Sequence, residues 1–494
     1  MIALVFLPVL GGIVCLVLKD RKSVSPIVAI VTTFASGSVL PFVIFEDASI
    51  ILGKWGSLGI GMAVDEFAIP FLLSTFIVML AVILNSIKRG YDGFFYALIL
   101  ILYGTLNSIF LSRDLFSIFV TIELASIISF ILISYEKKPR QAWASLKYLL
   151  LSSLGLNFYL LGIGIVYMET GSFAMDSLEH VSTIATVLIF GGLAVKSGLF
   201  FFSMWLPDAH SNAPIEVSPI LSGLIVKLDV YLSIRFITYS SFGWMRDTYM
   251  IIGIVSAIVG VIFAVNSKNA KRVLAYHTIS QVGFMLVNCD KSSAWHGFSH
   301  AVFKTLLFLV VGNISARLGT KEYSKWSGKI TKVEYAFLLI GSLAISGFPM
   351  TSGCVTKEII IHSACCPSVK ILLFIASTGT AMSFSKFIFL KPGESSSWPA
   401  ANTVAAYSIL SGVIIIHGII GFEIYMFESL LAVIAGMAGY LLLRKFLRPL
   451  PVYFERIDSA LSSYLILFLI SIVLAIILLL KRSIDSAIIV FVGE

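Results

Sequence analysis

The stretch KSGLFFFSMWLPDAHSNAP, residues 196–214, decides how the rest of the chain is interpreted. It joins a lysine, Lys196, at the end of an apolar run to Pro207 a few turns later. Proline breaks a helix because it lacks a backbone donor and clashes with the preceding turn. At membrane depth, freed backbone groups are tolerated only where protein or water satisfies them, so broken helices line hydrated cavities. The stretch predicts a membrane helix broken at residues 205–210, just after a buried lysine.

The composition of the whole chain is that of a membrane protein. Of its 494 residues, 58% are hydrophobic and 13% are charged, and the mean hydropathy is +0.98. Soluble domains carry about 25% charged residues, so a water-soluble fold is excluded. The net charge of +8 is attributed to membrane topology, and no nucleic-acid partner is expected. The five cysteines show no CxxC spacing, so we expect no metal or cofactor in this chain.

A membrane-spanning helix needs about 20 mainly apolar residues, and the chain offers about sixteen such segments. The fold class is therefore an all-α polytopic membrane protein. No basic segment precedes the first apolar run, which is expected to remain as a helix. The predicted segments are 2–18, 26–45, 66–87, 92–112, 115–135, 145–168, 182–204, 214–240, 248–266, 272–289, 295–318, 333–361, 368–390, 401–421, 424–443 and 461–482.

The basic residues indicate how these segments cross the membrane. If the N-terminus lies outside, most lysines and arginines fall in cytoplasmic loops, among them Lys147, Lys271 and Lys386. The bias persists to the end of the chain, which supports the segmentation. We expect a multi-pass protein of the cytoplasmic membrane with both termini outside.

Seven charged side chains are assigned to the depth of the membrane. A charged side chain at a helix centre costs about 2.5–3.5 kcal/mol on insertion scales, so such residues usually mark an ion path. Lysine suits that task because burial lowers its proton affinity into a range where it can bind and release a proton. The residues are Lys196, Lys227, Lys304, Lys357, Glu123, Asp229 and Glu358.

Two acids have candidate roles beside these lysines. Glu123 lies in the middle of segment 115–135, and its approach to Lys196 would set how firmly that lysine holds a proton. The alternative is a static ion pair that orients two helices. Asp229 is expected to contact either a neighbouring span or an ion, with a plain interhelical contact equally open.

A second break is predicted at Gly347–Met350, around Pro349 and before Lys357. The two breaks fall in the seventh and twelfth segments, as an inverted repeat of five-helix units requires. Ordinary kinking is the alternative. The predicted divisions are 1–112 (N-terminal helices and start of the first repeat), 92–240 (first repeat, input half-channel), 248–391 (second repeat, output half-channel) and 401–494 (C-terminal helices).

His296, His300 and Lys304 follow one another at four-residue spacing, which places them on one face of a helix. Histidine titrates near neutrality and has two ring nitrogens, so this face could relay protons between lysines. A metal site is the competing interpretation, but the chain has no HExxH motif and no evident third ligand.

Five stretches resemble the antiporter-like subunits shared by Mrp-type sodium/proton antiporters (D-type subunit), respiratory complex I and membrane-bound hydrogenase or sulfane reductase complexes. Their order and spacing make the resemblance specific over about 66–391. The stretches are MWLPDAHSNAP (204–214), VSPILSGLIVK (217–227), RVLAYHTISQVG (272–283), HAVFKTLLF (300–308) and GFPMTSGCVTK (347–357).

The resemblance implies about 14 core helices in two inverted five-helix repeats, broken helices 7 and 12, and about two extra C-terminal helices. It also implies a glutamate–lysine pair at Glu123 and Lys196, a connecting lysine at Lys227 and a terminal lysine at Lys357. His300 and Lys304 match bridging positions. The chain departs from the family at Asp229, Val230, His277 and Glu358, which leaves open whether protons alone or also sodium ions are carried.

The leading interpretation is an ion-translocating subunit of a multisubunit complex, coupled to redox chemistry in partner subunits of the hydrogenase, sulfane reductase or complex I type. Any iron–sulfur or nickel–iron centres would lie in those partners, and the chain alone is not expected to be catalytic. The alternative is a subunit of a stand-alone Mrp-type antiporter driven by an existing ion gradient. A structural scaffold with an inactive path is a third interpretation, which undiminished ion movement after Lys196→Ala would favour. The expected partners are other membrane subunits, protons or sodium ions, and the lipid bilayer.

Overall fold

The computed structural model describes residues 1–45, 49–53, 59–240, 242–393 and 398–444, together with residues 456 and 460. The helices follow one another with short connections. They are α1 (Ile2–Val17), α2 (Ser25–Phe45), α3 (Ala68–Ser86), α4 (Gly93–Leu111), α5 (Leu115–Ile133), α6 (Pro139–Thr170), α7 (Thr183–Ser197), α8 (Leu206–Asn212), α9 (Val217–Ile220), α10 (Val226–Tyr239), α11 (Gly243–Asn266), α12 (Ala270–Asn288), α13 (Lys291–Leu318), α14 (Lys332–Ser346), α15 (Ser352–Ser363), α16 (Pro367–Ile388), α17 (Ala401–Ile420) and α18 (Ser429–Leu443).

The predicted spans agree with these helices. Each predicted span up to residue 443 coincides with one helix or with consecutive helices, whereas the last, 461–482, lies outside the described residues. Within the described chain, ten helices are long and apolar enough to cross a membrane, and α1 and α7 are shorter apolar helices. The all-α polytopic membrane fold is therefore confirmed, while the count of 14 core helices and the division into repeats stay predictions.

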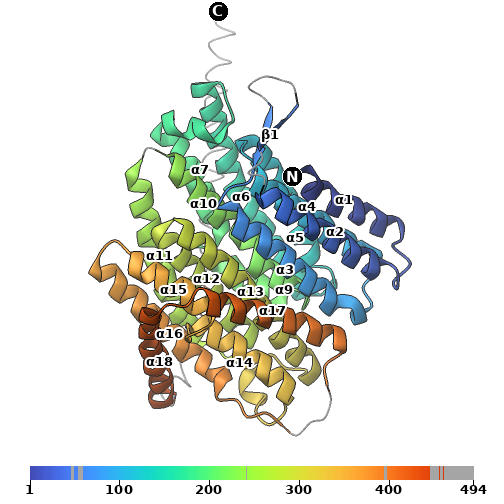
Figure 1. The fold of residues 1–494 in the computed structure, drawn as a ribbon, viewed down its shortest axis with the longest axis vertical. Helices are drawn as coiled ribbons and strands as arrows, with labels where there is room; N and C mark the ends of the chain where they lie inside the picture. Colours follow the sequence, from blue (N-terminus) through green and yellow to red (C-terminus); the bar gives the residue numbers. More distant parts are fainter. Residues whose placement is uncertain are drawn as a thin grey trace, which may run out of the picture.

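One element was not predicted. The strands β1 (Ser49–Leu52) and β2 (Ile60–Ala63) pair antiparallel, with Ser49 opposite Ala63. This hairpin lies between α2 and α3, beside the start of α5, where the Arg113 backbone N–H donates to the Gly61 carbonyl at 2.8 Å. It projects from one end of the helical bundle (Figure 1).

The helices form one bundle that runs from α1 and α2 on one side to α16 and α18 on the other (Figure 1). The helices α3 and α13 pack against each other near the middle, and α17 also lies against α3. Both helices are highly buried. In their most apolar stretches, 72% of the residues of α3 and 78% of those of α13 are buried, compared with 28% for α2 and α18. The centre of the bundle is therefore shielded from lipid, and α13 carries the histidine face predicted from the sequence.

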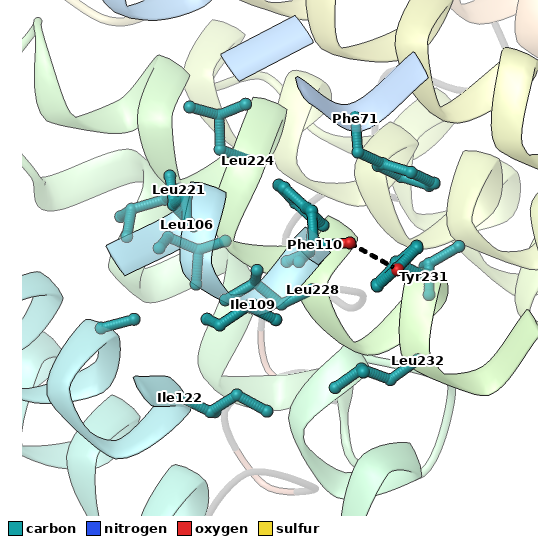
Figure 2. Close-up of a cluster of buried hydrophobic side chains, with 14 of the residues drawn as sticks. Phe71, Leu106, Ile109, Phe110, Ile122, Leu221, Leu224, Leu228, Tyr231 and Leu232 are labelled. Carbon is teal, nitrogen blue, oxygen red and sulfur yellow. Dashed lines mark hydrogen bonds between the residues drawn. The ribbon is translucent and has the colours of Figure 1, made fainter. Parts of the chain in front are cut away.

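A buried aromatic cluster joins α3, α4 and α10. The rings of Phe71, Phe110 and Tyr231 lie with their centroids 5.2–5.3 Å apart. Figure 2 shows the Tyr231 hydroxyl donating to the Phe110 carbonyl, at 2.7 Å. That carbonyl is in the last turn of α4, where no further helical N–H is available to it. The contact fixes α10 against the N-terminal helices.

The first break lies upstream of its predicted place. Helix α7 ends at Ser197, and Gly198 and Phe201 adopt left-handed backbone angles with φ of +70° and +79°. Pro207 does not interrupt a helix, because it occupies the first turn of α8, where its missing N–H is not needed. The predicted break at residues 205–210 is therefore wrong in position, since the chain turns at residues 198–202 and residues 206–212 are helical.

The second break has the same backbone pattern. Gly347 and Met350 take φ of +84° and +63°, and α15 then begins at Ser352 with the Thr351 side chain as its cap. Pro349 lies inside this break, as predicted. Both breaks thus consist of a left-handed glycine followed three residues later by a left-handed residue with a side chain.

A third irregularity precedes Lys227. Between α9 and α10 the residues Leu221–Ile225 form a π-helical turn, in which the Val226 N–H reaches back to the Leu221 carbonyl. Such turns widen a helix by one residue and are frequent at functional sites. The turn changes which backbone carbonyls accept helical hydrogen bonds immediately before Lys227.

The first break provides a test of the fold with two glycines, one inside α7 and one directly after it. Gly198→Ala should lower the free energy of unfolding by about 1–2 kcal/mol, because an added Cβ would meet Leu206 Cδ1 at 2.7 Å and alanine disfavours a φ of +70°. Gly191→Ala, inside α7 with nothing within 4 Å of the added Cβ, should leave stability unchanged or raise it by up to about 1 kcal/mol. Thermal unfolding of both variants in detergent measures the difference. Equal stabilities would contradict the left-handed geometry at Gly198.

Candidate functional site

The four lysines that the sequence singled out lie in three clusters of polar side chains. The four lysines, Asp229 and both histidines of α13 are at most 2% exposed, whereas Glu123 is half-buried. We name the clusters by their order in the chain. The amino-terminal cluster is Glu123, Ser126, Ser152, Lys196 and Asp229; the central cluster is Ser222, Lys227, Thr278, His300 and Lys304; and the carboxyl-terminal cluster is Gln281, His296, Ile345, Thr356 and Lys357.

In the amino-terminal cluster, two serines bind the lysine. Lys196 Nζ donates to Ser152 Oγ of α6 at 2.8 Å and to Ser126 Oγ of α5. The two hydroxyls are themselves 3.1 Å apart. Glu123 lies one turn before Ser126, and its Oε2 is buried without a hydrogen-bond partner among the described residues. Glu123 therefore forms no ion pair with Lys196 in the structure. The Lys196 ammonium donates its hydrogen bonds to the two serine hydroxyls instead.

Asp229 of α10 supplies a second carboxylate to the amino-terminal cluster. It is fully buried, and neither carboxylate oxygen has a hydrogen-bond partner in the described part of the chain. The Lys196 ammonium is close enough to act on it electrostatically. A buried carboxylate is costly unless an opposite charge compensates it. Asp229 therefore lies within electrostatic range of Lys196 without a hydrogen bond to it.

The central cluster surrounds the π-helical turn. Lys227 Nζ donates to the Ser222 carbonyl at 2.7 Å and lies 2.6 Å from His300 Nδ1. Lys304, one turn after His300 on α13, donates to the Leu274 carbonyl of α12. Each ammonium thus bonds to a backbone carbonyl oxygen, and His300 contacts the first of the two lysines.

Two hydroxyl groups lie between the π-helical turn and the carbonyl that binds Lys304. Ser222 Oγ lies 2.8 Å from Thr278 Oγ1, which donates at 3.2 Å to the same Leu274 carbonyl that accepts from Lys304. His300 Nε2 faces away without a partner among the described residues. The central cluster therefore holds two sets of hydrogen bonds, one joining His300, Lys227 and the Ser222 carbonyl, and one joining the Ser222 hydroxyl, Thr278, the Leu274 carbonyl and Lys304.

The carboxyl-terminal cluster lies at the second break. Lys357 Nζ donates to the Ile345 carbonyl at 2.6 Å, in the last turn of α14. His296 Nδ1 lies 2.8 Å from Thr356 Oγ1, and His296 Nε2 lies 3.2 Å from Gln281 Oε1. His296 thus connects α12, through Gln281, to the residue next to Lys357 on α15.

The bonds of His296 can run in either direction. With Gln281 Oε1 facing the ring, His296 carries its proton on Nε2 and Nδ1 accepts from Thr356. A half-turn of the Gln281 amide presents its N–H instead, so that Nδ1 carries the proton and donates to Thr356, which in turn donates to the Ser352 carbonyl at 3.0 Å. A neutral histidine with two such arrangements can carry its proton on either ring nitrogen, a property that a proton relay requires.

The other residues of interest lie near these clusters but bond differently. Glu358 is buried on α15 within electrostatic range of both Lys357 and Glu428. His277 packs on the Phe384 ring at 4.7 Å and has no hydrogen-bond partner among the described residues. Lys386 was expected in a cytoplasmic loop, but it is buried on α16 and donates to the carbonyls of Ala264, Val265 and Ser267.

The sequence did not single out the hydroxyl partners. Ser126, Ser152, Ser222, Thr278 and Thr356 were not predicted, and Gln281 of the motif at 272–283 had no assigned partner. Their one sequence signal is a polar side chain one or two turns from an intramembrane charge, which is a common occurrence in such helices. In the described residues, no three His, Cys, Asp or Glu side chains are grouped so that they could hold a metal ion.

The hydroxyl of Thr278 provides a test of the central cluster. Thr278→Val keeps the shape of the side chain but leaves the Ser222 hydroxyl unpaired, which should lower the free energy of unfolding by about 1–2 kcal/mol. Thr305→Val is the matched control, because that hydroxyl bonds only to the Ala301 carbonyl of its own helix, at 2.7 Å. Chemical denaturation in detergent compares the two. A Thr278 variant no less stable than the Thr305 variant would contradict the bridging role.

Comparison with known proteins gives consistent matches. Residues 112–383 match the family model described as "NADH:quinone oxidoreductase/Mrp antiporter, TM". The N subunit of the NADH-quinone oxidoreductase of Desulforudis audaxviator is 30% identical over 290 residues, which are 54% of this chain and 58% of that protein. The D subunit of the Na(+)/H(+) antiporter of Alkalihalophilus pseudofirmus is 27% identical over 341 residues, 63% of this chain and 69% of the relative.

A solved structure shares the fold over nearly the whole described chain. A chain of the membrane-bound sulfane sulfur reductase, an archaeal respiratory membrane complex, superposes with a TM-score of 0.76 at 24% sequence identity. The match covers 90% of this chain and 99% of that chain. The fold is therefore that of a polypeptide found within a larger membrane complex, and the family model spans all three buried clusters.

Proposed function

Because the chain belongs to the NADH:quinone oxidoreductase/Mrp antiporter transmembrane family, we propose that it is an ion-translocating subunit of a multisubunit membrane complex. The matched region covers little more than half of the oxidoreductase N subunit, so the activity of that relative supports the proposal without establishing it. The residues proposed to carry the ion are Glu123, Lys196, Asp229, Lys227, His300, Lys304, His296, Lys357 and Glu358.

The observation that carries the proposal is the succession of buried charged and polar side chains through the three clusters. Asp229 and Lys227 stand two residues apart on α10 and so join the amino-terminal cluster to the central one. His300 and His296 stand one turn apart on α13 and join the central cluster to the carboxyl-terminal one. Ammonium, imidazole, hydroxyl and amide groups thus follow one another through the buried centre of the bundle.

The chemistry of these groups favours the proton as the ion. Lysine and histidine nitrogens bind protons, whereas hard cations are bound by oxygen ligands. The central cluster offers two ammonium groups and an imidazole, and none of its side chains is a carboxylate. Sodium binding is more plausible chemically at the amino-terminal cluster, where Asp229, Glu123 and two serine hydroxyls supply oxygens. Proton movement with a sodium-linked step there is the alternative that the antiporter relatives favour.

Replacement of the connecting lysine tests the path. Lys227→Met removes the bonds to Ser222 and His300 while keeping the side-chain volume, and we expect ion movement to fall at least about tenfold, since one step of transfer is lost. Lys386→Met is the matched control: it also removes a buried lysine, but one bonded to carbonyls at the end of α11. A pH-sensitive dye in inverted membrane vesicles measures both. Undiminished movement in the Lys227 variant would favour a scaffold with an inactive path.

The setting of the chain is the second part of the proposal. Relatives come both from redox complexes and from antiporters, so the partner subunits either hold iron–sulfur or nickel–iron centres or hold none. We expect a redox-coupled complex in the cytoplasmic membrane. Both chain termini are placed outside in this proposal.

Gentle purification of the tagged chain from its native membrane distinguishes the two settings. Mass spectrometry of the companions and iron analysis of the same sample should show stoichiometric iron–sulfur proteins. Small membrane subunits without iron would instead place the chain in an antiporter driven by an existing gradient.

A further inference from the structure

A basic basin opens on the surface of the bundle, away from the three clusters. Two adjoining cavities, each of about 650 Å³, share Pro139, Arg140, Asn212 and Lys321 in their linings. Volumes of this size are typical of sites for small ligands or headgroups. Five basic side chains line the basin, from the starts of α6 and α12 and from the segment after α13: Lys138, Arg140, Lys271, Arg272 and Lys321.

The two carboxylates of the basin, Asp208 and Glu136, already form ion pairs within the protein. Asp208 pairs with Lys147 at 2.8 Å and with Arg272 at 2.7 Å, and Glu136 pairs with Lys138 at 2.6 Å. No carboxylate of the described chain forms an ion pair with Arg140, Lys271 or Lys321, although Glu136 lies within electrostatic range of Lys271 and Lys321. Lys321 donates only to the Ser211 carbonyl, at 2.7 Å. Five basic side chains against two carboxylates, Glu136 and Asp208, leave the lining of the basin predominantly basic.

The basic groups also repel one another. Desolvation in the basin lowers the pKa of Lys321, and the neighbouring cations of Arg140, Lys138 and Arg272 lower it further. The side chains are nevertheless held close together by the starts of two long helices, whose N-terminal ends add partial positive charge. A bound anion would relieve this repulsion.

An apolar surface leads away from the basin along α6. Trp143 lines the basin and is 60% exposed, and Leu146 and Leu150 follow it at 41% and 58% exposure. These three residues lie on one face of the helix and extend over about 10 Å. Tryptophan is enriched at the membrane–water interface, so this face marks where headgroups give way to acyl chains.

From the basin and this adjoining apolar face, we infer that the chain binds the headgroup of an anionic phospholipid between α6, α8, α12 and α13, with an acyl chain along Trp143, Leu146 and Leu150. Basic pockets between membrane helices are suited to such headgroups. A soluble phosphate would use the basin alone and would leave the apolar face unexplained. The lipid would link α6, which carries Ser152, to α12 and α13, which carry the central cluster.

The test uses the purified complex that contains this chain, depleted of lipid and titrated with phosphatidylglycerol or with phosphatidylcholine in nanodiscs, with bound lipid read by native mass spectrometry. The wild type should retain several-fold more phosphatidylglycerol than phosphatidylcholine. The double variant Arg140→Gln, Lys321→Gln should lose that preference. The control, Lys329→Gln with Lys332→Gln, removes two charges from an exposed part of the chain outside the basin and should keep it.

Three results would overturn the inference. The first is equal retention of both lipids by the wild type, or an unchanged preference in the Arg140, Lys321 variant. The second is displacement of phosphatidylglycerol by soluble glycerol phosphate at equal affinity, which would make the basin a site for free anions. The third is loss of a companion protein from the variant with its lipid preference intact, which would make the basin a protein interface. Thermal unfolding of each variant verifies that it is folded.

Discussion

Bonds from buried ammonium groups to backbone carbonyl oxygens are the interaction on which the rest of this structure depends. Lys357 bonds to Ile345 at the end of α14, Lys227 to Ser222 in the π-helical turn, and Lys304 to Leu274. A carbonyl without a partner and an ammonium without a counter-charge each cost several kcal/mol in an apolar medium. The bond offsets part of both costs. At the π-helical turn and at the second break, the irregular backbone and the lysine bonded to it are therefore one feature.

The two helix breaks show how this feature is built twice. Lys196 stands two residues before the left-handed Gly198, whereas the Lys357 ammonium reaches the carbonyl of Ile345, two residues before the left-handed Gly347. The first lysine thus belongs to the helix before its break. The second belongs to the helix after its break, but its ammonium group lies at the end of the helix before it. This correspondence supports the proposed relation of the two repeats.

Much of the membrane fold could be predicted from the sequence. Apolar runs of spanning length are difficult to misread, and charges are rare within them, so the lysines and the face of His296, His300 and Lys304 stand out. The exact place of the first break could not be predicted, because Pro207 begins a helix and the left-handed angle at Phe201 has no sequence signature. The partner of Lys196 was also missed, since only tertiary packing brings Ser126 and Ser152 to it. Three buried lysines were assigned to loops from the sequence: Lys147, Lys271 and Lys386. Counting basic residues on each side of the membrane does not reveal whether a lysine near a helix end is buried.

In the carboxyl-terminal cluster, the orientation of the Gln281 amide depends on which ring nitrogen of His296 carries the proton. In the proposed path, a proton that arrives at one ring nitrogen of His296 and departs from the other changes the tautomer of the ring. The ring and the Gln281 amide must then both turn before a second proton can follow in the same direction. Each passage would therefore be followed by a reorientation of uncharged groups. That reorientation would set an upper limit on the rate at which the carboxyl-terminal cluster passes protons.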